Sequence, residues 1–313
     1  MPMVIIRPYD AERDEDAVFA LWQTTLGRQW PLAAAAFQKI ITGSPQYQAD
    51  DHFVARRGEQ IAGFVAAQVN RDDPGTGGIP VLCVDPEFQR QGVGTALHEA
   101  ALAHLRARGA ARLQLGVGYS YFWPGVPDNL PAAKPFFQAR GWDFDEPCYD
   151  LAQRMQDYRS PKDSISEIAL ELAAPEDVPA LLDFEWREFP NWLGAFQSIA
   201  DIGDFGDLLI ARDRRSPTII GSLILYSHHS HPSRVDGIWK ELLGDPLGEI
   251  GCVGVAADAH NRGIGSALVA RGSEILKQRG VEAVHIGWVY RVNFYGRLGY
   301  AKWRMFHMSW RNL

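Results

Sequence analysis

The 313-residue sequence has few cysteines, no long apolar run and no cluster of positive charge, and each scarcity excludes a class of protein. The three cysteines, Cys83, Cys148 and Cys252, are too few and too scattered for a disulfide framework or a zinc site. No stretch approaches the roughly 18 apolar residues of a membrane span, and the N-terminus becomes charged at Arg7, too early for a signal peptide. We therefore expect a reduced, cytoplasmic protein with no metal site and no membrane contact.

The charge balance also limits the partners. The formal net charge is −7, and no run of Lys and Arg offsets it. Non-specific binding of nucleic acid requires clustered positive charge, so we expect no nucleic-acid partner. At roughly 100–200 residues per domain, the length fits two domains, each able to bury its own core.

The sequence contains an internal repeat. Residues 82–97 (LCVDPEFQRQGVGTAL) align without a gap with residues 253–268 (VGVAADAHNRGIGSAL), at an offset of 171 (263 − 92). In both copies an apolar strand leads to two glycines separated by one residue, and an amphipathic helix follows and ends at an Arg-Gly. Later in each half a short helix closes on Gly-aromatic, over 136–142 and 294–300.

The segments before the glycines correspond as well. Opening strands are predicted at 4–8 and 168–172, each followed by a helix with an acidic start. A hairpin over 52–69 matches one over 208–226, with Gly63 and Gly221 equivalent at an offset of 158 (221 − 63). The offset then grows by 13 (171 − 158), so the second half carries an insertion within 228–248.

These correspondences predict two domains, residues 1–157 and 164–313, joined by a polar linker with a proline at 158–163. Each half reads strand–helix–helix–strand–strand–strand–helix–strand–helix–strand. This order predicts an α+β fold, in which helices flank a mixed, largely antiparallel sheet.

The paired glycines open a helix, and a helix N-terminus suits a phosphate or pyrophosphate. Glycine lets the backbone approach a ligand, and the first amides of the helix are free and carry partial positive charge. Neither half has the Lys of a P-loop. Leu97 and Leu268 stand where a dinucleotide fingerprint needs a third Gly or Ala.

The remaining pattern, Gln/Arg-x-x-Gly-x-Gly/Ala, resembles that of the GNAT superfamily of N-acetyltransferases. Residues 89–94 fit it fully, and residues 260–265 fit except at His260, which implies at most one weaker phosphate contact. The resemblance covers essentially the whole chain and implies two GNAT folds in tandem, with acetyl-CoA as co-substrate. In that fold the strand before the motif splays from its neighbour and pairs with the pantetheine arm, and the next amides hold the pyrophosphate. The implied cofactor-binding residues are Leu82, Cys83, Val84, Gln89, Arg90, Gln91, Gly92, Val93, Gly94 and Thr95 in the first half, and Val253, Gly254, Val255, His260, Asn261, Arg262, Gly263, Ile264, Gly265 and Ser266 in the second.

Amide formation also needs proton transfer, because a protonated alkylamine cannot attack a thioester and the departing thiolate needs a proton. GNAT enzymes often place a Glu on the strand before the motif and a Tyr in the last short helix. Glu249 and Tyr295 stand at these places, whereas the first half has Gly78 and Phe137. The resemblance therefore implies chemistry in the second half, with Tyr295 as general acid and Glu249 as candidate base. A strand-edge carboxylate and a core aromatic are the structural alternatives.

Three further features have less specific interpretations. The aromatic, Pro-containing segment 119–127 could wall an acceptor pocket or be a packed connection. The acidic and aromatic stretch 183–207 suits a cationic amine, but a solvated helix face has a similar composition. The insertion contains a cluster of three histidines, His228, His229 and His231. Metal ligands are normally held by regular structure and by hydrogen bonds from neighbouring groups, and a loop provides neither, so we expect no metal site there.

The acceptor is not specified by these motifs. We expect a primary amine on a small molecule, such as an amino sugar, aminoglycoside, polyamine or amino acid, and a protein amine is an alternative. Two other functions remain open: a non-catalytic, CoA-binding regulatory module, and a transferase of a longer acyl group.

Overall fold

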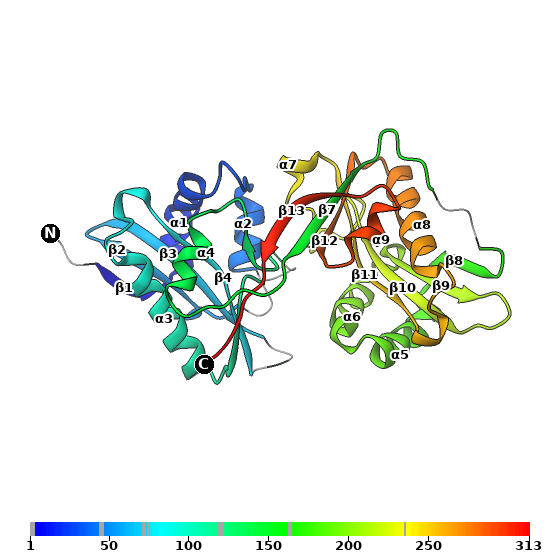
Figure 1. Cartoon of the computed structure of the whole chain (residues 1–313), viewed down its shortest axis with the longest axis horizontal. Helices are drawn as coiled ribbons and strands as arrows, with labels where there is room; N and C mark the ends of the chain where they lie inside the picture. Colours follow the sequence, from blue (N-terminus) through cyan, green and yellow to red (C-terminus); the bar gives the residue numbers. More distant parts are fainter. Residues whose placement is uncertain are drawn as a thin grey trace. The chain divides into compact units, whose positions relative to one another are not determined.

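The computed structural model describes residues 4–43, 47–70, 73, 75–117, 122–161, 165–234 and 236–313, which form two compact units (Figure 1). Unit 1 comprises Met1–Cys148 and Arg304–Leu313, and unit 2 comprises Tyr149–Trp303. Of the predicted linker, residues 158–161 lie in unit 2, and residues 162 and 163 lie outside the described residues.

Unit 1 is built on a six-stranded sheet in the order β1-β2-β3-β4-β5-β14. Only β4 and β5 run parallel, and the other neighbouring strands are antiparallel. The elements are β1 (Ile5–Pro8), α1 (Ala11–Thr25), α2 (Ala34–Ile41), β2 (His52–Arg57), β3 (Gln60–Val69), β4 (Thr76–Val84), α3 (Val93–Ala107), β5 (Arg112–Leu115), β6 (Val126–Pro127), α4 (Ala133–Gln138) and β14 (Trp310–Asn312).

Unit 2 repeats this plan, with its strands in the order β8-β9-β10-β11-β12-β7-β13. Here β11 and β12 are the parallel pair. The elements are β7 (Cys148–Arg154), β8 (Ile168–Leu172), α5 (Val178–Glu188), α6 (Leu193–Asp201), β9 (Leu208–Asp213), β10 (Ile219–Tyr226), α7 (Lys240–Leu243), β11 (Leu247–Val255), α8 (Ile264–Gln278), β12 (Ala283–Val289), α9 (Val292–Gly296) and β13 (Ala301–His307).

The predicted α+β class and mixed sheets are confirmed, and so is the order of the main elements in both halves. The units nevertheless differ from the two halves of the sequence. Strand β7, from the first half, pairs with β12, and β14, from the end of the chain, pairs with β5. Each half therefore contributes its last strand to the other unit, and for this reason residues 149–157 group with unit 2 and 304–313 with unit 1.

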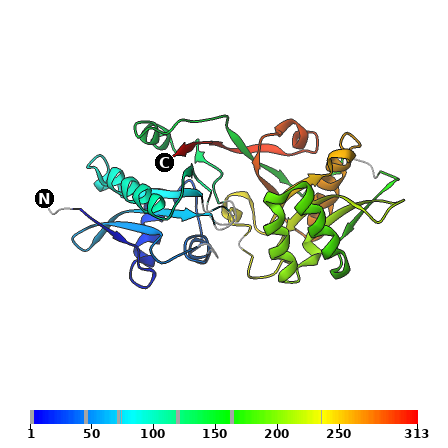
Figure 2. The ribbon, with the colours of Figure 1, turned by 90° about the horizontal axis from the view of Figure 1, so that it is seen from below.

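Each sheet separates two layers of helices. In unit 1, α3 lies on one face and α1 with α2 on the other (Figure 2). In unit 2, a Cβ on Gly221 of β10 would lie 3.0 Å from Leu268 of α8, while the neighbouring Ser222 contacts Glu185 of α5. Successive strand residues point to opposite faces, so α8 covers one face of this sheet and α5 the other.

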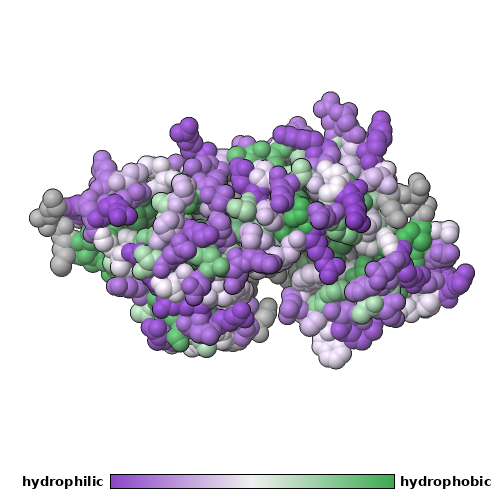
Figure 3. Space-filling model, viewed as in Figure 1, coloured by the Kyte–Doolittle hydropathy of each residue, from purple (hydrophilic) through white to green (hydrophobic). Residues whose placement is uncertain are grey.

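Apolar side chains are concentrated inside each unit, where they form separate hydrophobic cores. On the face shown in Figure 3, hydrophilic residues predominate, and hydrophobic residues form small separate patches. Within the described ranges, no helix has both the length and the apolar character needed to cross a membrane.

Candidate active site

The two glycine motifs adopt the same backbone conformation. Helix α3 begins after Gly92 (φ 87°) and α8 after Gly263 (φ 78°), and neither of these N-cap residues supplies a side-chain hydrogen bond. Two positions earlier, Arg90 (φ 60°) and Asn261 (φ 63°) are also left-handed. Turns of this kind collect amides into an anion-binding concavity, and the first amides of each helix have no acceptor within the helix. Both loops therefore fit a pyrophosphate.

The strand before each motif parts from its parallel neighbour. Strand β4 pairs with β5 from Thr76 to Ile79, and β11 pairs with β12 from Leu247 to Glu249. Both strands then continue for several residues, to Val84 and Val255, paired only with the strand on their other side. The predicted pantetheine-binding segments, 82–84 and 253–255, lie on these open edges, where the described residues provide no further strand partner.

His260 makes the contact that Gln89 makes in unit 1. The Nε2 of Gln89 donates a hydrogen bond to the carbonyl of Val84 over 2.9 Å. The Nε2 of His260 lies 2.9 Å from the carbonyl of Val255, five residues back along the chain as in unit 1. The side chain at this position therefore ties the loop to the end of its strand, and a ring N–H does this as well as an amide.

This equivalence predicts the effect of substitutions at His260. We expect His260→Ala to lower the free energy of unfolding by about 0.5–1.5 kcal/mol, the net value of one hydrogen bond. His260→Gln restores an N–H donor and is expected to recover most of this loss, as measured by urea denaturation. Equal stability of the Ala and Gln variants would contradict the proposed tie.

The second glycine of each motif packs against the short helix that follows the next strand. A Cβ on Gly94 would lie 3.1 Å from Phe136 of α4, and one on Gly265 would lie 3.4 Å from Phe294 of α9. The small residue lets the short helix approach the loop. In unit 2 this contact fixes α9 and with it Tyr295, the neighbour of Phe294.

Tyr295 is a partly buried phenol. Burial, with a smaller effect of Cys252, raises the pKa of Tyr295 to about 12, although Arg291 opposes the shift. The hydroxyl is therefore protonated at neutral pH and can donate a proton but not accept one. This state suits the general acid that the sequence predicts.

Glu249 is held by an imidazolium. It lies opposite His285 in the β11–β12 pair, with its Oε1 3.2 Å from the His285 Nδ1. The Nε2 of His285 lies 3.1 Å from Asp150 of β7. Burial alone would lower the pKa of His285, but its contacts with Asp150 and Glu249 outweigh burial and raise the pKa to about 10. A protonated His285 therefore joins two carboxylates, and sequence reasoning identified only Glu249.

Glu185 of α5 is a second carboxyl group, which the sequence interpretation named only as a member of the acidic stretch 183–207. Its side chain is 0% exposed, and the Ser222 hydroxyl of β10 donates a hydrogen bond of 2.5 Å to its Oε1. Its Oε2 has no hydrogen-bond partner within the described part of the chain. Burial raises the pKa of Glu185 to about 7, although the Ser222 hydrogen bond opposes the shift. The predicted acidic stretch 183–207 thus turns two carboxylates inward, Glu185 and Asp207, while Trp186 is 62% exposed.

Glu185 and Tyr295 both interact electrostatically with Cys252, which forms a bulge in β11. Ser222 pairs with Gly254 and Ile224 with Gly251, so two residues of β11 stand opposite one of β10. Cys252 has a φ of 50°, as bulged residues can. Burial, then the charges of Glu185 and Asp236, raise the pKa of its thiol to about 12. The carboxylates of Glu185 and Asp236 therefore lie near this thiol, and Cys252 in turn raises the pKa of Tyr295.

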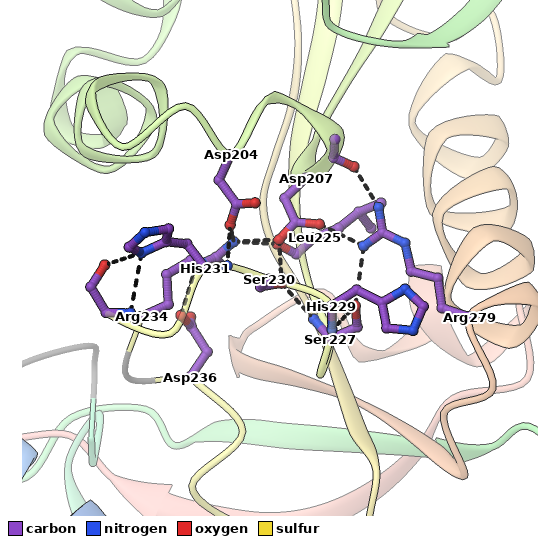
Figure 4. Close-up of polar contacts among 12 residues, drawn as sticks. Asp204, Asp207, Leu225, Ser227, His229, Ser230, His231, Arg234, Asp236 and Arg279 are labelled. Atoms are coloured by element: carbon purple, nitrogen blue, oxygen red, sulfur yellow. Dashed lines mark hydrogen bonds and ion pairs between the residues drawn. The ribbon is translucent and has the colours of Figure 1, made fainter.

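The insertion predicted within 228–248 brings Asp236 to this site. Figure 4 shows how it is anchored: buried Asp207 accepts hydrogen bonds from Arg234 (2.8 Å), from Arg279 (2.5 Å) and from the Ser230 hydroxyl. Arg234 in turn donates to Asp236 over 3.0 Å. The insertion is thus attached to the sheet by a network of buried charges, which holds Asp236 in place.

The three histidines of the insertion have other contacts. The rings of His228 and His229 lie edge to face at 4.2 Å, and the Nδ1 of His231 lies 2.7 Å from the Ser233 hydroxyl. Within the described ranges, no group of three or more His, Cys, Asp or Glu side chains is placed to hold a metal ion.

Unit 1 is filled by aromatic side chains at the equivalent place. Trp22 of α1 is buried and lies 5.7 Å from Phe122 and 5.6 Å from Trp123, ring centre to ring centre. Phe122 and Trp123 are themselves buried, so this part of the predicted aromatic segment is a packed connection. The first tyrosines of the segment, Tyr119 and Tyr121, lie outside the described residues.

A sheet that parts beside an uncapped, glycine-started helix, present twice in one chain, is the arrangement expected of a tandem N-acetyltransferase. A model of the Acetyltransferase (GNAT) family matches residues 16–141 and 171–300. The chain therefore belongs to the GNAT family, as a tandem-domain N-acetyltransferase, and this confirms the resemblance recognised in the sequence.

Individual relatives support the same assignment. Mycothiol acetyltransferase of Salinispora arenicola is 28% identical over 272 residues, which are 80% of this chain and 78% of that protein. A solved glucosamine N-acetyltransferase region of a fungal multi-domain GH3 β-N-acetylglucosaminidase has a TM-score of 0.93 and 37% identity. That match covers 99% of this chain but only 38% of the solved chain. A tandem GNAT protein from the clavulanic acid biosynthesis pathway, with a TM-score of 0.70, 15% identity and coverage of 99% and 98%, is similar in fold alone.

Proposed function

We propose that unit 2 transfers the acetyl group of acetyl-CoA to the primary amine of a small amino sugar. The observation that carries this proposal is the convergence of Glu185, Asp236 and Tyr295 on Cys252, with Glu249 close by, at the open edge of β11. Carboxylates bind an ammonium group and sugar hydroxyls, and a phenol can protonate a thiolate.

An amino sugar is favoured over other small amines by the similarity to the glucosamine N-acetyltransferase region, at 37% identity over 99% of this chain. The site itself supports this choice. Glu185, Asp236 and Glu249 supply several hydrogen-bond acceptors, which suit the amine and the hydroxyl donors of an amino sugar, whereas a simple alkylamine would engage only one or two of them.

The chain's own residues divide the work of transfer. The backbone of 253–255 pairs with the pantetheine arm, and the amides of 261–266 hold the pyrophosphate. Tyr295 gives its proton to the departing thiolate. Glu249, fixed by His285, receives the acceptor's ammonium group.

Unit 1 is proposed as a partner domain with a cofactor loop but without an acceptor site. Its loop, residues 89–95, has the same left-handed turns as that of unit 2. The positions equivalent to Glu249 and Tyr295 are Gly78 and Phe137. At these two positions CoA bound there would find no proton-exchanging side chain, and the buried Trp22 stands where unit 2 has Glu185.

The test is an acceptor panel. We expect purified protein with acetyl-CoA to release CoA thiol fastest with glucosamine, more slowly with spermidine and amino acids, and not with peptides. Release is followed with a thiol reagent, and the acetylated product by mass. The same assay with longer acyl-CoA thioesters defines the acyl group. Preference for a peptide amine over every amino sugar would contradict the proposed acceptor.

A further inference from the structure

We propose that Glu185 accepts the proton that the amine nitrogen loses during transfer, with the Ser222 hydroxyl holding its carboxylate in position. This inference rests on the proposed function of unit 2. The fully buried carboxyl group of Glu185 has a single side-chain hydrogen bond, and its second oxygen has no partner within the described residues. An unsatisfied buried oxygen of this kind requires an explanation.

Unit 1 shows that the fold does not need this pair. Asp14 and Asp177 each accept a hydrogen bond from the backbone amide that precedes their helix, which aligns α1 with α5 at an offset of 163 (177 − 14). At this offset the buried residues of α1 fall on the buried residues of α5, and Trp22 corresponds to Glu185 (185 − 163).

The partner of Glu185 is replaced in the same way. At the hairpin offset of 158, Ser222 corresponds to Phe64 (222 − 158), which is fully buried. The same fold therefore accepts two aromatic residues where unit 2 has a carboxyl and a hydroxyl group. Buried charged groups are often neutral or unfavourable for stability compared with well-packed apolar residues. We infer that unit 2 keeps the polar pair for its chemistry.

The position of the pair connects it with the open edge. Ser222 pairs with Gly254, in the segment of β11 where the pantetheine arm is proposed to bind. The charge of Glu185 raises the pKa of the Cys252 thiol, and this bulged residue also raises the pKa of Tyr295. The proposed proton acceptor and proton donor thus both act on the same bulged residue.

The neutral amine attacks the thioester carbon, a C–N bond forms, and the nitrogen then carries one proton more than the amide needs. Glu185 takes that proton. The C–S bond breaks with its electron pair on sulfur, and Tyr295 gives its proton to the thiolate. A proton passing from Glu185 to Tyr295 through solvent resets both groups.

Glu185 suits this task better than Glu249. Glu249 already accepts a hydrogen bond from protonated His285, whereas the second oxygen of Glu185 is unpartnered in the described structure. The pKa of Glu185, raised by burial to about 7, is close to neutral pH, where a base combines availability with proton affinity. Glu249 then binds the ammonium group, which loses its first proton to solvent before attack, and Glu185 removes the second proton after the C–N bond has formed.

The experiment compares Glu185→Gln, Ser222→Ala and Glu249→Gln in the full chain, with Asp183→Asn as control, an exposed carboxylate on the same helix that pairs with Arg187. We expect Glu185→Gln to lower kcat about 10²–10⁴-fold and leave acetyl-CoA affinity unchanged. Glu249→Gln is expected chiefly to raise KM for the amine, and Asp183→Asn to match the wild type.

The pH profile separates a base from a structural group. Wild-type kcat is expected to rise with pH through about 7, the pKa of Glu185, and Glu185→Gln to lose this rise. Ser222→Ala removes a hydrogen bond that lowers this pKa, so the rise shifts to higher pH. A retained wild-type profile in Glu185→Gln overturns the inference alone.

Stability provides a readout that does not depend on turnover. The pKa of Glu185 is raised from 4.5 to about 7, so between these values the native state holds a proton that the unfolded state has lost. Wild-type stability therefore falls as pH rises through this range, and Glu185→Gln removes that fall. A fall of equal size in both proteins overturns the inference. If the wild type acetylates no amine, the proposed function fails and the role of Glu185 fails with it.

Discussion

Ser266→Glu is expected to weaken acetyl-CoA binding by unit 2 about 100-fold or more without lowering the stability of the protein. Ser266 is the third residue of α8, counted from the Gly263 N-cap, and it lies among the amides proposed to hold the pyrophosphate. Two like charges about 4 Å apart repel by about 4 kcal/mol at an effective dielectric constant of about 20. The same negative charge stabilises the first turn of a helix by about 0.3–1 kcal/mol. Binding and stability should therefore change in opposite directions.

Two matched variants interpret the result of Ser266→Glu. In Ser266→Gln the new side chain is nearly as large as glutamate but uncharged, so the dissociation constant for acetyl-CoA should stay within a few-fold of the wild-type value. Thr95→Glu places the charge at the equivalent position of α3, where the Arg140 guanidinium, already bonded to the Thr95 hydroxyl, can neutralise it. Calorimetric titration counts the sites in each variant. Loss of turnover in Thr95→Glu but not in Ser266→Glu would move the chemistry to unit 1.

The cofactor loops could be predicted from the sequence because their signal is local. Each loop has three features within about 16 residues: a left-handed glycine, a second glycine that leaves space for an aromatic ring, and an amphipathic helix that follows them. The chain shows this pattern twice. Even the departure at His260 was visible. The sequence did not show that the His260 ring would make the same contact as Gln89. The structure shows it, because both side chains reach the carbonyl at the end of their strand.

The exchange of strands could not be predicted, and part of the site depends on it. Strands β7 and β14 have the same place in their halves, and nothing in their residues specifies which sheet they join. Asp150 lies in β7, so its contact with His285 joins residues 135 positions apart (285 − 150) that the repeat assigns to different domains. A search of the second half alone could find Glu249 but not Asp150, which contacts His285, the partner of Glu249.

Glu185 was predicted only as one member of the acidic stretch 183–207, and its burial was missed for a different reason. It sits in a helix with several exposed charges, and a carboxylate there has the appearance of an ordinary solvated residue. The signal was nonetheless present. The helix repeat places Glu185 on the face occupied by Leu181 and Phe184, and the comparison with Trp22 marks that face as buried. An internal duplication can therefore reveal a buried polar group, provided the helices are aligned by their buried faces and not only by the glycine motif.

Tyr295→Phe is expected to lower kcat of the acetyl transfer about 10²–10⁴-fold, the usual contribution of a positioned acid. The substitution removes only the hydroxyl. The ring keeps its edge-to-face contacts with Phe294, at 4.8 Å, and with Tyr300, at 6.4 Å. KM for either substrate and the unfolding temperature should therefore change little.

Tyr300→Phe is the matched control, because it removes a buried hydroxyl close to the same ring. The Tyr300 hydroxyl lies 2.7 Å from that of Ser273, inside the core, and takes no part in the proposed transfer. This variant is expected to lose about 1 kcal/mol of stability and to keep kcat. The two variants thus separate chemistry from packing. If Tyr295→Phe retained wild-type kcat while Tyr300→Phe behaved as expected, the thiolate would take its proton from solvent, and the open edge of β11 would act through binding and the carboxylates alone.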